Sequence, residues 1–272
     1  MSKKDRKRIA LVAGASSGLG RCFVRQIGER YPSLQEIWVI ARRRERLESL
    51  RKEMTFQAPG IRIRILELDL SEQASFSVLS ACLREECPRL RLLVNAAGLG
   101  HAGRVDEQEL EGICDTIDVN CRALMAVTRI CLPYLERGSR VIELASGSAF
   151  APQPGFAVYA ASKACVLSFC RALREELRPQ GILVTAVCPG PVKTEFFRAG
   201  GISLSPIKRR FLTEPERVVR RALSDSAKGK ALSIYGLPMN LFRFTAGVLP
   251  EGMLVRLSSR ILRNKMIREG NR

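Results

Sequence analysis

The 272-residue sequence predicts an α/β protein in which helices cover both faces of one parallel sheet of about seven strands. Short runs of β-branched residues alternate with longer segments of helical period along most of the chain, as is typical of successive βαβ crossovers. No proline- or serine-rich linker, low-complexity tract or internal repeat interrupts this alternation. Residues 1–272 are therefore expected to form a single, doubly wound domain.

The predicted elements follow this alternation in order. The predicted strands are Ile9–Ala13, Glu36–Ala41, Ile61–Glu67, Arg91–Asn95, Arg140–Ala145, Ile182–Val187 and Ala231–Tyr235. The predicted helices lie between them and are Leu19–Arg30, Arg43–Phe56, Ser71–Glu86, Thr116–Glu136, Ser162–Arg178 and Glu214–Ala227. These elements form a core over residues 8–235. Residues 192–212 and 236–272 fit the alternation less well, and we expect a substrate lid and a C-terminal helical appendage there.

A glycine-rich segment, AGASSGLG, follows the first predicted strand and places Gly14, Gly18 and Gly20 at a strand-to-helix turn. Glycines at such a turn let the backbone approach a pyrophosphate closely, and the N–H groups at the start of the next helix bind the phosphates. The spacing is Gly-x-x-x-Gly-x-Gly rather than Gly-x-Gly-x-x-Gly. The turn therefore predicts a nucleotide site, with an ordinary glycine turn as the alternative.

Further motifs occur in a fixed order along the chain. They are NAAG at 95–98, Asn120, Ser146, YAASK at 159–163, CPG at 188–190 and Thr194. Ser146 lies thirteen residues before Tyr159, and the Tyr-x-x-x-Lys spacing puts Tyr159 and Lys163 on one face of a helix. In this order and spacing, over about residues 8–235, the motifs resemble the short-chain dehydrogenase/reductase family.

The resemblance implies a Rossmann-type, NAD(P)-dependent oxidoreductase with four catalytic residues. Tyr159 would exchange a proton with the substrate oxygen while a hydride moves to or from the nicotinamide. A free tyrosine has a pKa of about 10, and the Lys163 ammonium together with the oxidised nicotinamide would stabilise its phenolate. Ser146 would position the reacting carbonyl, and Asn120 would hold a water that links Lys163 to solvent. A solvated helix face is the alternative for a Tyr-x-x-x-Lys pair without the other motifs.

The preferred cofactor is predicted from the end of the second strand, where the sequence is WVIARRRERL. NAD-preferring members of the family carry an acidic residue at the position of Arg42. Guanidinium groups of Arg42 and Arg43 can instead bind a 2′-phosphate, so NADP(H) is favoured, although both arginines could equally begin a solvated helix. Asp69 in the segment ELDLS matches the family's adenine-contacting aspartate, with Leu70 beside it.

The resemblance implies a larger set of cofactor contacts. They are Gly14, Ser16, Ser17, Gly18, Leu19, Gly20, Arg42, Arg43, Asp69, Leu70, Asn95, Ala96, Ala97, Gly98, Tyr159, Lys163, Pro189, Gly190, Val192 and Thr194.

The substrate side is less clearly marked. The expected residues are His101, Ser148, Phe150, Phe156 and Phe196. The phenylalanines suggest an apolar cleft for a hydrophobic ketone or alcohol, such as a ketoacyl or hydroxysteroid compound, but these side chains could equally cover the sheet edge.

The composition has an excess of positive charge, since 45 Lys and Arg against 27 Asp and Glu give a net charge of +18. Nucleic-acid binding normally needs a concentrated basic patch with stacking aromatics, whereas these arginines are spread along a chain with one Trp and four Tyr. A nucleic-acid partner is therefore disfavoured. The alternative to an enzyme is a non-catalytic, nucleotide-sensing protein that binds nucleic acid or an anionic membrane surface through its basic face.

Nine cysteines without a Cys-x-x-Cys pair, together with a single histidine, provide no metal site. We expect reduced thiols and a cytoplasmic location, since no export signal or membrane-spanning run is found.

The resemblance implies a homodimer or homotetramer paired through the helices over 116–136 and 162–178. The surplus of apolar residues in the second of these helices supports this expectation. Residues 249–268 have the pattern of a basic amphipathic helix. Its apolar face could cover the substrate cleft, contact another subunit or bind an anionic membrane, so peripheral membrane association is a further possibility.

Overall fold

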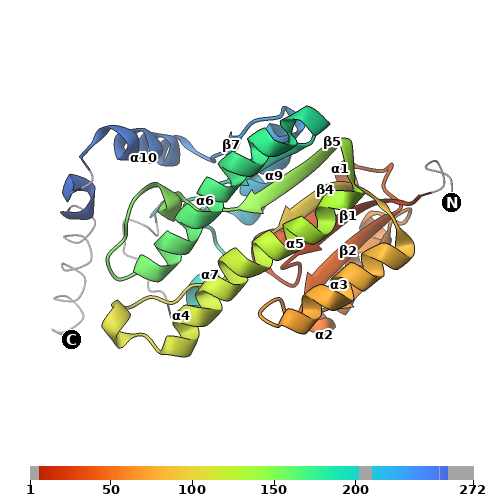
Figure 1. The fold of residues 1–272 in the computed structure, drawn as a ribbon, viewed down its shortest axis with the longest axis horizontal. Helices are drawn as coiled ribbons and strands as arrows, with labels where there is room; N and C mark the ends of the chain where they lie inside the picture. The colour runs from red at the N-terminus through yellow and green to blue at the C-terminus, as the bar shows by residue number, and fades with distance from the viewer. Residues whose placement is uncertain (1–5, 202–209, 251, 257–272) are drawn as a thin grey trace.

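The fold is that of a computed structural model, which describes residues 6–201, 210–250 and 252–256. A central sheet runs through the molecule, and helices pack on both of its faces (Figure 1). The seven strands are β1 (Arg8–Ala13), β2 (Glu36–Ala41), β3 (Arg62–Glu67), β4 (Arg89–Asn95), β5 (Leu135–Leu144), β6 (Leu183–Val187) and β7 (Leu232–Ser233). This confirms the predicted fold class.

The strand order is β3-β2-β1-β4-β5-β6-β7, and every neighbouring pair is parallel. The chain builds outward from β1 to β3 and then returns to place β4 on the other side of β1. The carboxyl ends of β1 and β4 therefore flank the point where the strand order reverses, which is where ligands bind in open α/β sheets.

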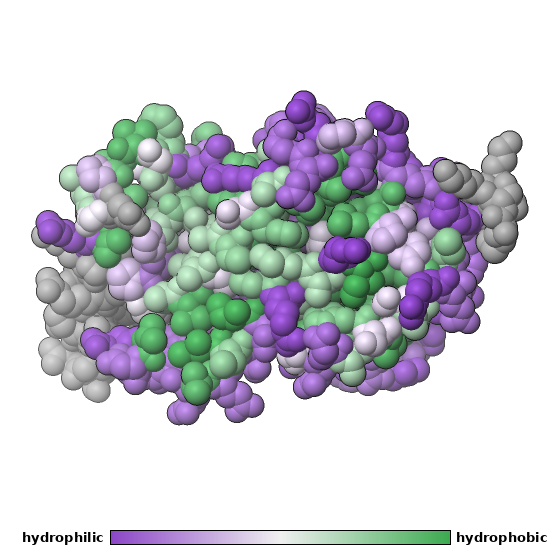
Figure 2. Space-filling model, viewed as in Figure 1, coloured by the Kyte–Doolittle hydropathy of each residue, from purple (hydrophilic) through white to green (hydrophobic). Residues whose placement is uncertain are grey.

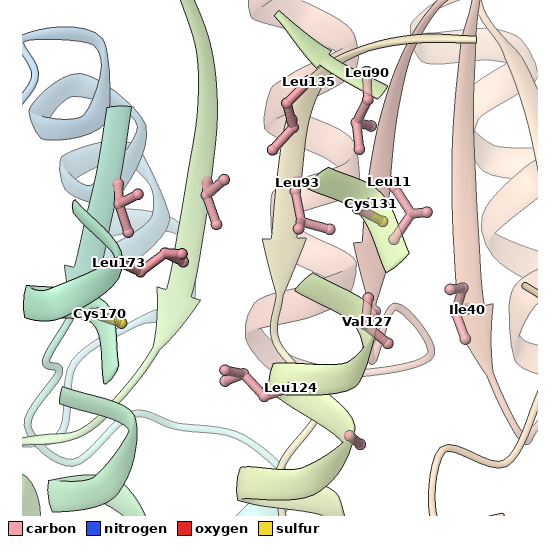
Figure 3. Close-up of a cluster of buried hydrophobic side chains, with 14 of the residues drawn as sticks. Leu11, Ile40, Leu90, Leu93, Leu124, Val127, Cys131, Leu135, Cys170 and Leu173 are labelled. Atoms are coloured by element: carbon pink, nitrogen blue, oxygen red, sulfur yellow. The ribbon is translucent and has the colours of Figure 1, made fainter. Parts of the chain in front are cut away.

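The helices form two layers. The layer in front in Figure 1 contains α3 (Gln73–Glu86), α5 (Leu124–Cys131) and α6 (Ala157–Leu177), and the layer behind contains α1 (Gly18–Arg30), α2 (Arg44–Gln57) and α9 (Pro215–Ala227). Alternate residues of β1 supply the two cores between these layers: Ile9 and Leu11 face the first, whereas Ala10 and Val12 face the second. Figure 3 shows part of the first core, where Leu11 of β1 and Leu93 of β4 lie beside Val127 of α5.

The segment predicted as one helix, Thr116–Glu136, is not a single helix, and this prediction was wrong. It contains the end of α4 (Leu110–Ile117), a π-helical turn (Asp118–Ala123), α5 and a short 3-10 turn (Leu132–Tyr134), and β5 already begins at Leu135. Pro133 has no backbone N–H for a helix to use, and Leu135 pairs with Leu90 of β4 instead. The π-helical turn contains Asn120, and such turns occur frequently at functional sites.

The remaining predicted elements agree with the structure to within a few residues. The largest shifts are at β5, which begins at Leu135 rather than Arg140, and at α6, which begins at Ala157 rather than Ser162, so Tyr159 lies in the first turn of α6. The predicted lid, 192–212, contains the short helix α7 (Phe196–Ala199), and residues 202–209 lie outside the described residues.

The C-terminal segment contains α10 (Leu237–Val248) and a helical turn at 252–256, and residues 257–272 lie outside the described part. Within the described ranges, no helix is both long and apolar enough to span a bilayer. On α10, Met239 packs against Gly147 and Gly190, two glycines in loops beyond the carboxyl ends of β5 and β6. The C-terminal appendage therefore covers the edge of the sheet at which the predicted site lies.

Candidate active site

The glycine segment after β1 forms a tight turn against the loop after β4. Gly14 and Gly18 have φ angles of 78° and 53°, which favour glycine. A side chain on Gly14 would collide with the backbone of Ala96 and Ala97, and one on Gly20 would collide with the Gly14 carbonyl. The two loops approach this closely only because Gly14 lacks a Cβ atom, and the turn folds back on itself only because Gly20 lacks one.

The N-terminus of α1 is open to an anion. Its cap residue, Ser17, accepts no backbone hydrogen bond with its side chain, and the first turn contains no acidic residue. The first N–H groups of a helix have no partner within the helix and carry partial positive charge. The turn therefore has the donors and the space that a pyrophosphate needs.

The two arginines after β2 differ in their surroundings. Arg43 donates hydrogen bonds to the hydroxyls of Ser16 and Ser17, at 3.2 and 3.0 Å, and so lies over the glycine turn. Arg42 is exposed and lies 3.6 Å from Asp69. Burial alone would raise the pKa of Asp69, but hydrogen bonds from Ser71 and the charge of Arg42 hold that pKa below its usual value. Asp69 is therefore an ionised carboxylate beside the arginines.

Asn95, the first residue of NAAG, points into the core rather than toward the turn. Its amide donates to Thr128 Oγ1 and to Glu143 Oε1, at 2.9 and 3.1 Å. Burial raises the pKa of Glu143 to about 8, against the opposing hydrogen bonds from Thr128 and Asn95, so this carboxyl group is neutral near neutral pH. The Asn95 side chain thus anchors the loop through a neutral, buried cluster, and Ala96 to Gly98 face the turn.

Tyr159 lies in a group of aromatic rings. Its ring stacks on Phe156 with centroids 4.4 Å apart, and Phe196 of α7 lies 5.3 Å away. A Cβ atom on Gly100 would lie 2.5 Å from the Tyr159 ring, so this glycine leaves the ring its space. Three separate segments therefore enclose the ring.

The hydroxyl of Tyr159 interacts with Ser146 at the end of β5, as the family motif implies. Burial raises the pKa of Tyr159 to about 12, although the hydrogen bond with Ser146 acts in the opposite direction. Burial also lowers the pKa of Lys163 to about 8. The phenol is therefore neutral near neutral pH, which suits a proton donor.

Lys163 and Asn120 meet beside Gly98. The Lys163 ammonium donates to the Leu144 carbonyl at 2.8 Å and lies 5.8 Å from the centroid of the Tyr159 ring. The Asn120 amide donates to the Leu99 carbonyl at 2.8 Å, while its Oδ1 accepts from the Leu99 N–H at 2.9 Å. A Cβ atom on Gly98 would lie 3.2 Å from Asn120 Oδ1 and 3.3 Å from Lys163 Nζ. The absence of a side chain at Gly98 leaves this polar corner open.

The other predicted cofactor residues pack in the two cores or beside the glycine turn. Leu70 and Val192 are buried in the two cores, and Leu19 packs against the second core. Thr194 lies over Gly18, and the Pro189 carbonyl accepts a hydrogen bond from Gly147.

Among the predicted substrate residues, Phe150 packs on the first core and Ser148 donates to Gln153 at 3.3 Å. His101 lies against Gly112 of α4. Phe156 and Phe196 are the two that contact the Tyr159 ring.

The sequence reasoning missed several residues that contribute to the site. Glu195 accepts hydrogen bonds from Arg43 and Arg46, Glu143 binds Asn95, and Met239 covers Gly147 and Gly190. Glu195 directly follows Thr194, so an acidic residue beside a predicted cofactor contact was a usable sign. Nothing local in the sequence marks Glu143 or Met239.

A doubly wound parallel sheet, a glycine turn after β1 and a buried Ser-Tyr-Lys group at the same edge define an oxidoreductase of the Rossmann class. The sequence model of the short chain dehydrogenases matches residues 8–201. The chain belongs to the short-chain dehydrogenase/reductase family, as its motifs implied.

Three similar proteins illustrate the range of the family. Sulfoacetaldehyde reductase 2 of Chromohalobacter salexigens is 35% identical over 199 residues, which are 71% of this chain and 77% of that protein. A short-chain dehydrogenase from Sphingobium yanoikuyae, solved in complex with NADPH, has a TM-score of 0.75 at 28% identity and covers 85% of this chain and 88% of its own. The bulky-bulky ketone specific alcohol dehydrogenase from Comamonas testosteroni has a TM-score of 0.71 at 25% identity, covering 84% of this chain and 86% of its own.

Proposed function

We propose that this protein is an NADP(H)-dependent oxidoreductase that interconverts a ketone or aldehyde and the corresponding alcohol, with Tyr159 as general acid and base. The observation that carries the proposal is the buried Tyr159 hydroxyl, which interacts with Ser146 and lies one helical turn from Lys163. These groups lie at the carboxyl edge of the sheet, as does the glycine turn.

The residues at this edge fit a nicotinamide dinucleotide. The glycine turn and the N-terminus of α1 suit the pyrophosphate, and Lys163 and Asn120 suit the nicotinamide end. When bound, the nicotinamide would supply or accept the hydride. The protein then has to bind and orient the carbonyl and move one proton.

The proton step follows from the state of Tyr159. A phenol whose pKa is raised to about 12 is protonated near neutral pH and can donate to a carbonyl oxygen. Ser146 would hydrogen-bond to the same oxygen and hold it near the phenol. The Lys163 ammonium lies on the same helix face and would stabilise the phenolate left behind. This arrangement suits the proton step of carbonyl reduction, and a preference for NADP(H) would favour that direction in a cell.

The preference for NADP(H) rests on the residues after β2. The position where an acidic residue would bind the ribose hydroxyls of NAD is Arg42, and Arg43 lies over the glycine turn. Guanidinium groups bind a phosphate with paired, charge-assisted hydrogen bonds. The Sphingobium relative in complex with NADPH is consistent with this preference.

Two substrate classes are favoured by different observations. The rings of Phe156 and Phe196 around Tyr159, together with the Comamonas relative, favour an apolar ketone such as a ketoacyl or hydroxysteroid compound. The Chromohalobacter relative favours a small anionic aldehyde. Nothing at the site argues for a purely non-catalytic, anion-binding role, since such a role has no need of a buried Tyr-Lys pair.

The test is to mix purified full-length protein with NADPH or NADH and with a panel of carbonyl compounds. The panel should include aliphatic ketones, acyl-thioester ketones, steroid ketones and sulfoacetaldehyde. We expect loss of NADPH absorbance with at least one compound, and an NADPH affinity at least about tenfold above that for NADH, or about 1.4 kcal/mol. The Arg42→Asp variant should narrow or reverse this gap. Equal affinities for the two cofactors would refute the preference, and turnover with neither cofactor would refute the activity.

A further inference from the structure

Glu195 connects two parts of the site that are distant in the sequence. Its two carboxylate oxygens accept hydrogen bonds from Arg46 at 2.6 and 2.7 Å, and one of them also accepts from Arg43 at 3.2 Å. Both arginines lie at the start of α2, about 150 residues earlier, with separations of 149 and 152. The hydrogen bond from Arg46 is the main reason that the pKa of Glu195 lies below its usual value, so Glu195 is present as an anion.

The two terminal nitrogens of the Arg43 guanidinium donate to different partners. One terminal nitrogen donates to the hydroxyls of Ser16 and Ser17 in the glycine turn, and the other donates to Glu195. The planar guanidinium matches the oxygens of carboxylate and phosphate equally well. Glu195 therefore engages one of the two terminal nitrogens with which Arg43 could bind a phosphate beside the glycine turn.

Glu195 also lies next to groups on the substrate side. The residue before it, Thr194, lies over Gly18, and the residue after it, Phe196, has its ring 5.3 Å from that of Tyr159. In α7, the N–H groups of Ala199 and Gly200 donate to the Glu195 and Phe196 carbonyls. The Glu195 carboxylate is therefore attached to the same short turn that holds Phe196.

We propose that Glu195 is a built-in anionic ligand of Arg43 and Arg46 that competes with the 2′-phosphate of NADP(H) and couples its binding to the position of Phe196 beside Tyr159. This inference rests on the proposed cofactor preference. When a cofactor with a 2′-phosphate binds, the phosphate replaces the Glu195 carboxylate at Arg43, and α7 loses its contact with Arg43. A cofactor without the phosphate leaves the Glu195 pairs in place.

The size of the effect follows from the exposure of the ion pairs. The side chains of Arg43, Arg46 and Glu195 are 41%, 38% and 37% exposed, so solvent screens their attraction. Such exposed pairs contribute at most about 1 kcal/mol, which corresponds to a roughly fivefold change in a dissociation constant. We therefore expect a moderate shift in cofactor affinity rather than an all-or-none switch.

The first experiment compares cofactor affinities in the full-length wild type and the Glu195→Gln variant. Removal of the carboxylate charge should tighten NADPH binding about three- to fivefold and leave NADH binding within about twofold. Glu214→Gln is the matched control, since it removes the same charge from a carboxylate that pairs with Lys193 near the same loop. Its affinities should match the wild type.

The second experiment tests the coupling to α7 by hydrogen exchange of residues 194–200. Adenosine 2′-monophosphate should speed exchange at Ala199 and Gly200 in the wild type, whereas adenosine 5′-monophosphate should not. In Glu195→Gln these amides should exchange faster from the outset and should not respond to the 2′-phosphate.

The outcomes separate this inference from the cofactor proposal. A wild type that prefers NADPH, with a variant whose NADPH affinity is unchanged or weaker, overturns the role of Glu195 alone. Absence of NADPH binding in both proteins overturns the cofactor preference and the inference with it. Equal exchange with both nucleotides contradicts the coupling to Phe196.

Discussion

At the scale of single residues, the phenol of Tyr159 is the group whose removal separates chemistry from binding. Tyr159→Phe keeps the ring and its stacking with Phe156 and removes only the hydroxyl. We expect turnover to fall at least about a hundredfold, the contribution usual for a general acid, while the affinity for NADPH changes little.

Lys163→Ala is the informative comparison, because it should lower both turnover and cofactor affinity. Steady-state kinetics and a fluorescence titration on the same samples measure both quantities. Near wild-type turnover in Tyr159→Phe would show that another group transfers the proton.

A second residue-scale prediction concerns Glu143 and pH. Its pKa is raised from 4.5 to about 8 in the folded protein, so between these values the folded state holds a proton that the unfolded state has lost. The contribution of Glu143 to stability is therefore fully present below about pH 4.5 and is lost as pH rises toward 8. Urea unfolding of the wild type should show a free energy that declines from pH 5 to pH 8.

Glu143→Gln is the control for this trend, because an amide keeps the shape of the side chain and cannot ionise. The free energy of unfolding of Glu143→Gln should decline clearly less from pH 5 to pH 8. The acidic groups with lowered pKa values, such as Glu36, Glu53 and Asp225, change stability only below their usual range and do not affect this window. Identical pH profiles for the wild type and Glu143→Gln would contradict the raised pKa.

At the scale of elements, the parts of the site are held by helix starts and strand ends. The π-helical turn between α4 and α5 places Asn120, the first turn of α6 places Tyr159, and the end of β5 precedes Ser146. These elements meet at the carboxyl edge of the sheet because all its strands are parallel. A small shift of any one element would misplace its side chain.

The helix α10 supplies an element-scale prediction. Met239 packs against Gly147 and Gly190, next to Ser146, whereas Leu241 on the same helix is exposed. Met239→Ala should weaken this contact, and we expect a several-fold rise in the KM for the carbonyl substrate with a smaller change in NADPH affinity. Because Met239 is only partly buried, the loss of unfolding free energy should be below the ~2–5 kcal/mol of a full core truncation.

Leu241→Ala is the matched control and should behave as the wild type in both measurements. If Met239→Ala and Leu241→Ala have the same KM, then α10 does not shape the substrate side.

At the scale of the whole molecule, the surface suggests how copies of the chain would pair. The apolar residues of the predicted helix over 162–178, including Val166, Leu167 and Cys170 of α6, are buried in the core of the protein itself, so the expectation that they pair two copies was wrong. Large apolar side chains are exposed instead on α4, at Leu110 and Ile117. Figure 2 shows this apolar area beside the weakly apolar outer surface of α5 and α6, with hydrophilic side chains around it.

We therefore expect a homodimer or homotetramer that buries the outer surfaces of α4, α5 and α6. Light scattering at micromolar concentration should give two or four times the chain mass of 30.2 kDa. Leu110→Glu together with Ile117→Glu should shift the mass toward the monomer, and Phe56→Glu, on the exposed side of α2, should not. A monomeric wild type would contradict this assembly. Electrostatic repulsion between chains that each carry a net charge of +18 would oppose pairing.

A peripheral membrane contact is one of the three alternatives for residues 249–268, beside a cover over the substrate cleft and a subunit contact, and most of that segment lies outside the described residues. Next to it, α10 exposes the apolar side chains of Leu241, Phe244 and Val248. A basic segment beside an apolar helix face gains from both anionic headgroups and the acyl boundary.

If the segment contacts membranes, the protein should sediment with anionic vesicles at low salt, and less at high salt or in a chain ending at Gly236. If no vesicle binding is found that requires the tail and weakens with salt, α10 is a cover over the substrate side or a contact between subunits.

The fold class and the principal site motifs could be predicted from the amino-acid sequence alone. The alternation of strand and helix periods is a local property, and it is sufficient to specify a parallel sheet whose strands end at one edge. The glycine turn and the Tyr159–Lys163 spacing are equally local, since one turn and one helix face fix their geometry. For that reason these features needed no knowledge of what packs against them.

The contacts between distant segments could be identified only from the tertiary structure. The Glu195–Arg46 pair joins residues 149 apart, and the Asn95–Glu143 hydrogen bond joins residues 48 apart. The periodic spacing of hydrophobic residues shows which face of a helix or strand is buried, but it does not show which other element covers that face. The start of α6, the break around Asn120 and the cover formed by Met239 all depend on such partners, and only the packed chain specifies them.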